Sequence, residues 1–298
     1  MPHFADLHTH STASDGVCSP AELVQHAAGA GLAAVALTDH DSISGVAGAM
    51  LEASEAGIEL VAGVEISAGD EPDLGRRGLH ILGLFIDHEE IGIGAFLDEQ
   101  ARCRVEQKRK QIKRFQELGF RIDEEAVFSR VNGVPGKPHL VEALLELNPE
   151  RELSEREIYR DYFGADGPAH VDREHEPPAE KCIEVIHRAG GVALLAHPLY
   201  QCGPADLEAL VRGLMAEGLD GIEIDCPYEE NEEFRHVAGG REEIVAPLVR
   251  IAKKLDLPIC GGSDFHGNHI GGAIGSGGVE RKRVKALRDF ASRTASDR

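Results

Sequence analysis

Two pairs of residues with the same spacing could each hold a metal ion. His8 and His10 end a short apolar run early in the chain, and Asp264 and His266 end another run late in the chain. Residues two apart on a strand face the same side, so each pair can reach one cation. A lone histidine at a strand end is more often a hydrogen-bonded core or loop residue. Two independent pairs favour metal ligands.

Further imidazoles and carboxylates stand where other apolar runs begin or end, or, for Asp15, in the turn Ser14-Asp15-Gly16 that follows the first run. They are Asp15, His40, Glu65, His80 and His197. Burying so many of these groups is costly unless they pair or bind metal, so packing alone does not explain them. The nine groups exceed what one cation needs. We therefore expect two or three divalent cations with a bridging carboxylate.

The donor set narrows the choice of ion. It combines imidazoles with carboxylates and contains no thiolate. This set suits Mn²⁺, Fe²⁺ or Zn²⁺, with Mn²⁺ expected first, better than soft ions or a purely Mg²⁺ site. We interpret Asp39 as a hydrogen-bonding partner that orients His40, and Asp41 as a solvated turn or cap residue. The other histidines are expected to be ordinary core or surface residues: His3, His26, His88, His170, His175, His187, His236 and His269.

The elements that must position these groups are visible as short apolar runs that alternate with amphipathic stretches. The runs cover residues 4–7, 33–38, 58–66, 80–85, 191–196, 221–225 and 258–262. This alternation predicts β/α units around a parallel sheet. Ser19-Pro20-Ala21-Glu22 predicts a capping box that opens the first helix. About seven units indicate a TIM-like β/α barrel, in which functional groups gather at the carboxyl ends of the strands.

The alternation stops over residues 96–176, where a long charged helix and shorter helices are expected. We predict a barrel of residues 1–95 and 177–298 with this helical insertion as a substrate cap. The basic residues between 102 and 114 are interpreted mostly as a solvated helix face.

Some basic residues near the predicted cap could bind phosphate. Lys137 and His139 follow a Gly/Pro turn at a helix start, where backbone N–H groups favour anions. A loop that merely joins two helices is equally consistent with this turn. Arg130, and Arg76 with Arg77 in the loop after the third strand, are further candidates for binding a substrate phosphate.

Composition restricts the function classes. The chain has 298 residues and a net charge of −21, which disfavours long nucleic acids and anionic membranes. Bound cations can still reverse the local field for a phosphorylated substrate. The six cysteines form no CxxC pair, no signal peptide follows Met1, and the apolar runs are short. We therefore expect a cytoplasmic protein with reduced thiols and no membrane partner.

The segments DLHTHSTASDG, LTDHD, GVEIS, HILG, AHP and GSDFH resemble the ordered motifs of the PHP (polymerase and histidinol phosphatase) family of amidohydrolase-like enzymes. The resemblance covers nearly the whole chain outside the insertion and implies a distorted (β/α)7 barrel with a trinuclear site. It would place His8, His10, Glu65 and Asp264 on one ion, Glu65, His80 and His197 on a second, and Asp15, His40 and His266 on a third. Some members have a histidine where this chain has Asp15.

The insertion and its GKPH turn make the chain most similar to stand-alone PHP proteins. These include a phosphatase of 3′,5′-nucleoside bisphosphates such as pAp and a 5′-to-3′ exoribonuclease of short RNA. The resemblance implies release of the 3′-phosphate of pAp to give AMP. We expect attack by a metal-bridging hydroxide, with Asp264 accepting its proton and His197 or His266 protonating the leaving oxygen.

Four other functions compete with this prediction. A 5′-to-3′ exonuclease acting on short oligonucleotides and a histidinol-phosphate-type phosphatase would use the same chemistry. An amide-bond hydrolase is more distant, since the cluster could also activate water against a carbonyl. A non-catalytic metal-binding domain is disfavoured, because every expected ligand position is filled.

Overall fold

The structure is a computed structural model that describes residues 4–164, 166–203, 206–267 and 271–297. Within these residues, seven strands form one sheet whose order follows the sequence. The strands are β1 (Ala5–Asp6), β2 (Ala34–Leu37), β3 (Glu59–Ser67), β4 (His80–Leu84), β5 (Val192–Leu195), β6 (Gly221–Asp225) and β7 (Ile259–Gly261). Each predicted apolar run therefore forms a strand.

Strand β4 runs against the others. β1 to β3 pair in parallel, as do β5 to β7, but β4 is antiparallel to both neighbours. The prediction of an all-parallel sheet is wrong here, because the β3–β4 connection lacks the crossover helix that a parallel pair requires. The reversal pairs His80, the first residue of β4, with Ser67, the last residue of β3. His80 thus lies at the edge where the parallel strands end.

The first and last strands meet and nearly close the sheet. The N–H of Leu7 donates to the carbonyl of Gly261 at 3.1 Å, and the N–H of His10 donates to the carbonyl of Phe265 at 2.8 Å. A Cβ atom on Gly262 would lie 2.3 Å from the backbone nitrogen of His8, so glycine is required for this approach. The predicted distorted barrel is confirmed, and closure sets the motif near the start beside the motif near the end.

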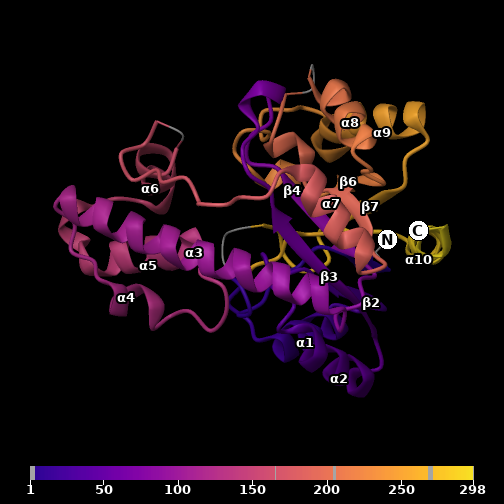
Figure 1. Ribbon diagram of the computed structural model, residues 1–298, viewed down its shortest axis with the longest axis horizontal. Helices are drawn as coiled ribbons and strands as arrows, with labels where there is room; N and C mark the ends of the chain where they lie inside the picture. Colours follow the sequence, from indigo (N-terminus) through magenta and orange to yellow (C-terminus); the bar gives the residue numbers. More distant parts are fainter. Residues whose placement is uncertain (1–3, 165, 204–205, 268–270, 298) are drawn as a thin grey trace.

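Helices surround the sheet, as Figure 1 shows. Ser19 caps the first of them: its hydroxyl accepts from the N–H of Glu22, whose carboxylate accepts from the N–H of Ser19, so the predicted capping box is confirmed. None of the described helices could cross a membrane. The helices are α1 (Pro20–Gly29), α2 (Val46–Ala56), α7 (Ala179–Arg188), α8 (Leu207–Ala216), α9 (Gly240–Leu255) and α10 (Arg281–Asp297).

Residues 96–176, called the insertion below, project from one side of the barrel (Figure 1). The helices in this part of the chain are α3 (Ile91–Glu117), α4 (Glu124–Phe128), α5 (Lys137–Leu147) and α6 (Glu155–Tyr162). Ile93, near the start of α3, packs in the barrel core, whereas Phe115, near its end, packs in a separate apolar cluster. One continuous helix therefore joins the two cores, and the boundary predicted at residue 96 lies inside it.

Candidate metal centre

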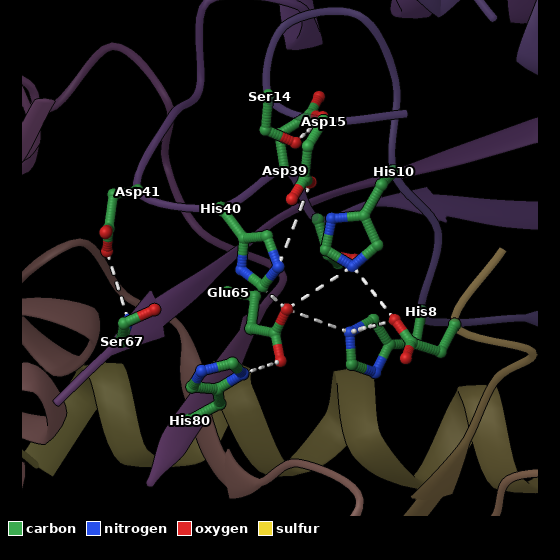
Figure 2. Close-up of polar contacts among 12 residues, drawn as sticks. His8, His10, Ser14, Asp15, Asp39, His40, Asp41, Glu65, Ser67 and His80 are labelled. Atoms are coloured by element: carbon green, nitrogen blue, oxygen red, sulfur yellow. Dashed lines mark hydrogen bonds and ion pairs between the residues drawn. The ribbon is translucent and has the colours of Figure 1, made fainter. Parts of the chain in front are cut away.

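The ends of β1 and β7 bring two imidazoles against one carboxylate. His8 and His10 are fully buried, and their Nε2 atoms lie 3.5 and 3.1 Å from Oδ1 of Asp264. The same two nitrogens lie 3.3 Å from Oε2 of Glu65 (Figure 2). The spacing of two therefore does place both histidines on one side of the chain, facing shared acids.

Glu65 stands at the centre of the cluster, and its two oxygens face different imidazoles. Oε2 lies 2.9 Å from Nδ1 of His40, in addition to its contacts with His8 and His10. Oε1 lies 2.9 Å from Nδ1 of His80 and 2.8 Å from Nε2 of His197. This arrangement suits a carboxylate that bridges neighbouring cations. It also depends on the reversed β4, since only that direction brings His80 to this edge.

Asp15 is the remaining carboxylate of the cluster. Its Oδ1 lies 3.5 Å from Nε2 of His266 and 3.9 Å from Nε2 of His40. Nδ1 of His266 lies 2.8 Å from the carbonyl oxygen of Asp264. A proton on Nδ1 therefore donates to that carbonyl and leaves the Nε2 lone pair directed at the cluster.

Three groups of side chains have ligand atoms within 4.8 Å of one another. His10, His40 and Glu65 each belong to two of these groups, so neighbouring cations would be held close together. His197 stands outside these groups, although its Nε2 contacts Glu65. The groups are His8/His10/Glu65/Asp264, His10/Asp15/His40/His266 and His40/Glu65/His80.

The cluster is a good fit for divalent cations. Several of its buried atoms lack a hydrogen-bond partner among the residues that the structure describes, which is costly unless an ion satisfies them. They are His8 Nε2, His10 Nδ1 and Nε2, Asp15 Oδ1, His40 Nδ1 and Glu65 Oε2. The donors are imidazole and carboxylate alone, as intermediate and hard divalent metals prefer.

The electrostatics of the cluster agree with this assignment. Burial by itself would lower the pKa of His10, but Asp264 and Glu65 outweigh it and raise that pKa to about 10. Burial would likewise raise the pKa of Glu65, yet the surrounding histidines hold it well below its usual range. A proton on His10 therefore helps to balance the acids when no metal is bound, a role that a cation would take over. His80 differs, because burial outweighs Glu65 there and lowers its pKa to about 4.

A PHP domain matches residues 6–164, which is more than half of the chain. The chain belongs to the PHP family. A solved amidohydrolase structure from Chromobacterium violaceum, with bound sulfate and no metal, has a TM-score of 0.80 at 26% identity over 96% of both chains. The PHP match and the ligand cluster identify the protein as a metal-dependent phosphoester hydrolase.

Three curated relatives of this PHP protein carry different names. A 5′-3′ exoribonuclease of Haemophilus influenzae is 34% identical over 88% of this chain and 89% of its own length. A phosphoribosyl 1,2-cyclic phosphate 1,2-diphosphodiesterase of Eggerthella lenta is 30% identical over 89% and 97%. A 3′,5′-nucleoside bisphosphate phosphatase of Chromobacterium violaceum is 30% identical over 90% and 88%.

One carboxylate that contacts the metal-site histidines was not predicted from the sequence. Glu223, in the middle of β6, is fully buried and lies 3.1 Å from Nδ1 of His8. It also accepts from the backbone N–H of His197 at 2.8 Å. Such contacts fix the ring orientation of a metal ligand. The signal was an acidic residue between Ile222 and Ile224, because a charge inside an apolar strand needs a partner.

The two aspartates beside His40 do not have the predicted roles. Asp39 accepts from the N–H of Ser11 at 2.8 Å and the hydroxyl of Ser14 at 2.6 Å, so it fixes the loop that carries Asp15. In the described part of the chain it has no hydrogen bond to His40. The prediction that Asp41 is a solvated turn residue is wrong, because its side chain is buried.

Asp41 instead joins the PHP barrel to the insertion. Its carboxylate accepts from Nε of Arg104, on α3, at 2.6 Å and from Nη1 of Arg173 at 2.7 Å. Burial would raise its pKa, but the two guanidinium groups outweigh burial and hold it at about 2. The prediction of a solvated basic face on α3 is wrong for Arg104 and also for Lys108, which is 2% exposed.

A cavity of about 450 Å³ opens over the cluster and reaches the insertion. Lys137 lines it, while the other four predicted phosphate ligands, His139, Arg130, Arg76 and Arg77, do not. His139 is buried and its Nδ1 accepts from the N–H of Gly136 at 3.0 Å. Arg130 donates to Glu146 at 2.6 Å, and Arg76 donates to Glu217 at 2.7 Å.

The histidines expected to be ordinary have mixed positions. His170 lines the cavity, and His187 lies 2.8 Å from Asp220. His26 contacts Cys18. His3 and His269 lie outside the described residues.

Proposed function

We propose that this PHP protein removes the 3′-phosphate from 3′,5′-nucleoside bisphosphates such as pAp, giving AMP and inorganic phosphate. The observation that carries the proposal is the lining of one cavity. Acids and histidines of the metal site line one part of it, and the basic side chains Arg104, Lys108 and Lys137 of the insertion line another. A small substrate with two phosphates matches these two kinds of lining. The bisphosphatase among the relatives supports the same substrate class.

The reaction breaks the bond between phosphorus and the 3′-oxygen and adds water to phosphorus. Bound divalent cations, for which we propose Mn²⁺, would supply charge neutralisation for the phosphoryl oxygens and acidify the attacking water. Asp264 accepts the proton of that water. Its carboxylate lines the cavity, and although burial raises its pKa, His8 and His266 outweigh burial and keep it ionised.

The leaving 3′-oxygen must gain a proton, and the two predicted donors, His197 and His266, both line the cavity. His266 is engaged with the carbonyl of Asp264 through Nδ1 and with Asp15 through Nε2. His197 lies outside the three ligand groups, but its Nε2 lies 2.8 Å from Oε1 of Glu65. Its Nδ1 lies 3.4 Å from the amide nitrogen of Gln201, and in the tautomer that accepts this hydrogen bond the ring proton is on Nε2 and faces Glu65. We therefore keep both histidines as proposed donors.

A second candidate is 5′-to-3′ exonuclease action on short RNA, which is favoured by the relative at 34% identity. Hydrolysis of an internal phosphodiester would use the same groups. The net charge of −21 limits this activity to short oligonucleotides.

Phosphate and nucleotide release by the Mn²⁺-loaded protein tests these proposals. The panel contains pAp, a short 5′-phosphorylated RNA, phosphoribosyl 1,2-cyclic phosphate and histidinol phosphate. We expect the highest kcat/KM for pAp. A preference for RNA would favour the second candidate, and a preference for either of the last two compounds would reject both nucleotide assignments. Asp264→Asn that retains its metals and full turnover would refute the role of Asp264.

A further inference from the structure

Asp6, the last residue of β1, has a fully buried carboxylate with no ion-pair partner among the described residues. Its Oδ1 accepts from the backbone N–H of Ser263 at 2.8 Å, and the N–H of His8 lies 3.4 Å from the same oxygen. Oδ2 accepts from the hydroxyl of Ser263 at 2.6 Å and from the N–H of Gly275 at 2.8 Å. A buried carboxylate without a cation is costly, so these hydrogen bonds stabilise it and fix the groups that donate them.

The bonds of Asp6 hold the segment that carries two groups of the metal cluster. Asp264 follows Ser263 directly, and His266 comes two residues later. The carbonyl of Ser263 also accepts from the N–H of Gly272 at 2.7 Å. Ser263 is therefore held through its N–H, its hydroxyl and its carbonyl, immediately before a residue of the cluster.

Asp264 needs such support, because its backbone conformation is one that aspartate rarely adopts. Its φ is 54°, in the left-handed region where a residue with a Cβ atom is disfavoured. In this conformation its Oδ1 lies 3.5 Å from Nε2 of His8 and 3.1 Å from Nε2 of His10. The surrounding structure has to maintain the conformation that brings the carboxylate to the two imidazoles.

A second aspartate repeats the arrangement beside another ligand. Oδ1 of Asp39 accepts from the N–H of Ser11 at 2.8 Å, and Oδ2 accepts from the Ser11 hydroxyl at 2.7 Å. Ser11 follows His10, as Ser263 precedes Asp264. In both places the two oxygens of one buried aspartate bind the N–H and the hydroxyl of one serine next to a residue of the cluster. This repetition indicates that the contacts support the ligands and do not only fill the core.

We propose that Asp6 is a positioning residue of the metal centre: through Ser263 it holds the carboxylate of Asp264 against His8 and His10. Asp6 belongs to none of the three ligand groups and does not line the cavity, so it acts through its neighbours alone. The inference rests on the metal centre and not on the identity of the substrate.

Asp6→Asn tests the proposal, because the amide keeps the shape of the side chain but offers one acceptor oxygen and one NH2 group. Whichever way the amide turns, the N–H of Ser263 or of Gly275 then meets a donor. Mn²⁺ titration followed by calorimetry should show one ion bound about 10- to 100-fold more weakly than in the wild type. Wild-type Mn²⁺ affinity in Asp6→Asn would overturn the proposal.

Asp220→Asn is the matched control. The side chain of Asp220 is 7% exposed, and its carboxylate also accepts from a backbone N–H, that of Ala193, at 2.8 Å. Asp220 directly precedes β6 and therefore lies at the end of the barrel opposite the metal cluster. Its substitution should lower the melting temperature and leave Mn²⁺ affinity as in the wild type. An equal loss of Mn²⁺ affinity in both variants would assign Asp6 to general stability and reject the positioning role.

A double variant separates positioning from a loss that does not involve Asp264. If Asp6 acts through Asp264, adding Asp6→Asn to Asp264→Asn should weaken Mn²⁺ binding by less than about 2-fold. Losses that multiply in the double variant would show that Asp6 does not act through Asp264. No substrate enters these titrations, so failure of the proposed phosphatase activity leaves their outcome unchanged.

Ser263→Ala carries the same test if Asp6→Asn fails to fold. It removes the hydroxyl donor and keeps the bonds from the N–H groups. One Mn²⁺ ion should bind about 3- to 10-fold more weakly, and this loss should disappear in the Asp264→Asn background. Hydrogen–deuterium exchange of the metal-free protein should also be faster over residues 263–267 in Ser263→Ala than in Asp220→Asn. Wild-type Mn²⁺ affinity and unaltered exchange in Ser263→Ala would overturn the proposal.

Discussion

Two regions line one cavity: the barrel rim, which is the set of metal-site side chains at the strand ends, and the insertion. The charged side chains of the two regions are neutralised in different ways. At the rim, acids and imidazoles balance one another around Glu65, and their buried unpaired atoms face a common centre. On the insertion, Arg104 is neutralised by Asp41, while Lys108 has no acidic ion-pair partner among the described residues. The rim therefore presents metal-binding groups to the cavity, and the insertion wall presents basic side chains.

The difference also concerns how each region is held. Rim residues stand at strand ends that the sheet fixes through backbone hydrogen bonds. Insertion residues depend on α3, whose two ends pack in different cores. We expect changes at the rim to act first on metal content and activity, and changes at the insertion to act on substrate choice and stability.

The largest effect should follow a change at the centre of the rim. Glu65→Gln replaces the carboxylate that contacts His8, His10, His40 and His80, so metal content should drop and kcat/KM should fall about 10³-fold. Elemental analysis and phosphate release measure the two quantities. Glu106→Gln, an exposed residue of α3, is the control and should change neither. Full metal content in Glu65→Gln would contradict the bridging role.

A smaller effect is expected where the insertion is tied to the barrel. Asp41→Asn leaves Arg104 and Arg173 without their shared acid, which should lower the free energy of unfolding by about 3–5 kcal/mol. Urea denaturation measures the change. Asp161→Asn, which alters an exposed pair with Arg160, should leave stability unaltered. Equal stability of both variants would show that the tie contributes nothing to folding.

The ion pairs of Asp41 with Arg104 and Arg173 also predict that the free energy of unfolding depends on pH. The pKa of Asp41 is about 2 in the folded chain, below the value of about 3.9 for an unfolded aspartate. Its contribution is therefore complete above about pH 4 and is lost as pH falls toward 2. The stability difference between wild type and Asp41→Asn should shrink over that interval. A constant difference would reject the assignment.

The sequence predicted the rim far better than the insertion, for physical reasons. The motif DLHTH carries a spacing of two that translates into shared direction along an extended chain. In GSDFH the same rule does not apply, because Asp264 has a φ of 54° and lies beyond β7. The strands themselves appeared as apolar runs, so the ends that carry His40 and Glu65 could be located. The direction of β4 was missed, because a short apolar run has no signal for parallel or antiparallel pairing.

The insertion offered no comparable rule. Lys108 lies among other basic residues of α3, and helical spacing alone could not separate the exposed ones from those directed at the cavity. Asp41 likewise looked solvated, because its partners Arg104 and Arg173 come from residues far along the chain. Sequence patterns reveal how a side chain is directed within one element, but not which distant element it meets.

The smallest predicted effect concerns the point where the two regions touch. Gly136 ends the loop before α5, and a Cβ atom there would lie 2.3 Å from Oδ2 of Asp15. Its φ of −103° is open to any residue, so Gly136→Ala tests the contact and not backbone strain. The added methyl group should push Asp15 from His40 and His266 and weaken one metal ion about 10-fold. Mn²⁺ titration followed by calorimetry measures this loss, with Gly94→Ala as the control, because a Cβ atom there meets nothing within 4 Å. If Gly136→Ala binds all its ions as tightly as Gly94→Ala, the insertion has no influence on the rim, and the two regions meet through the substrate alone.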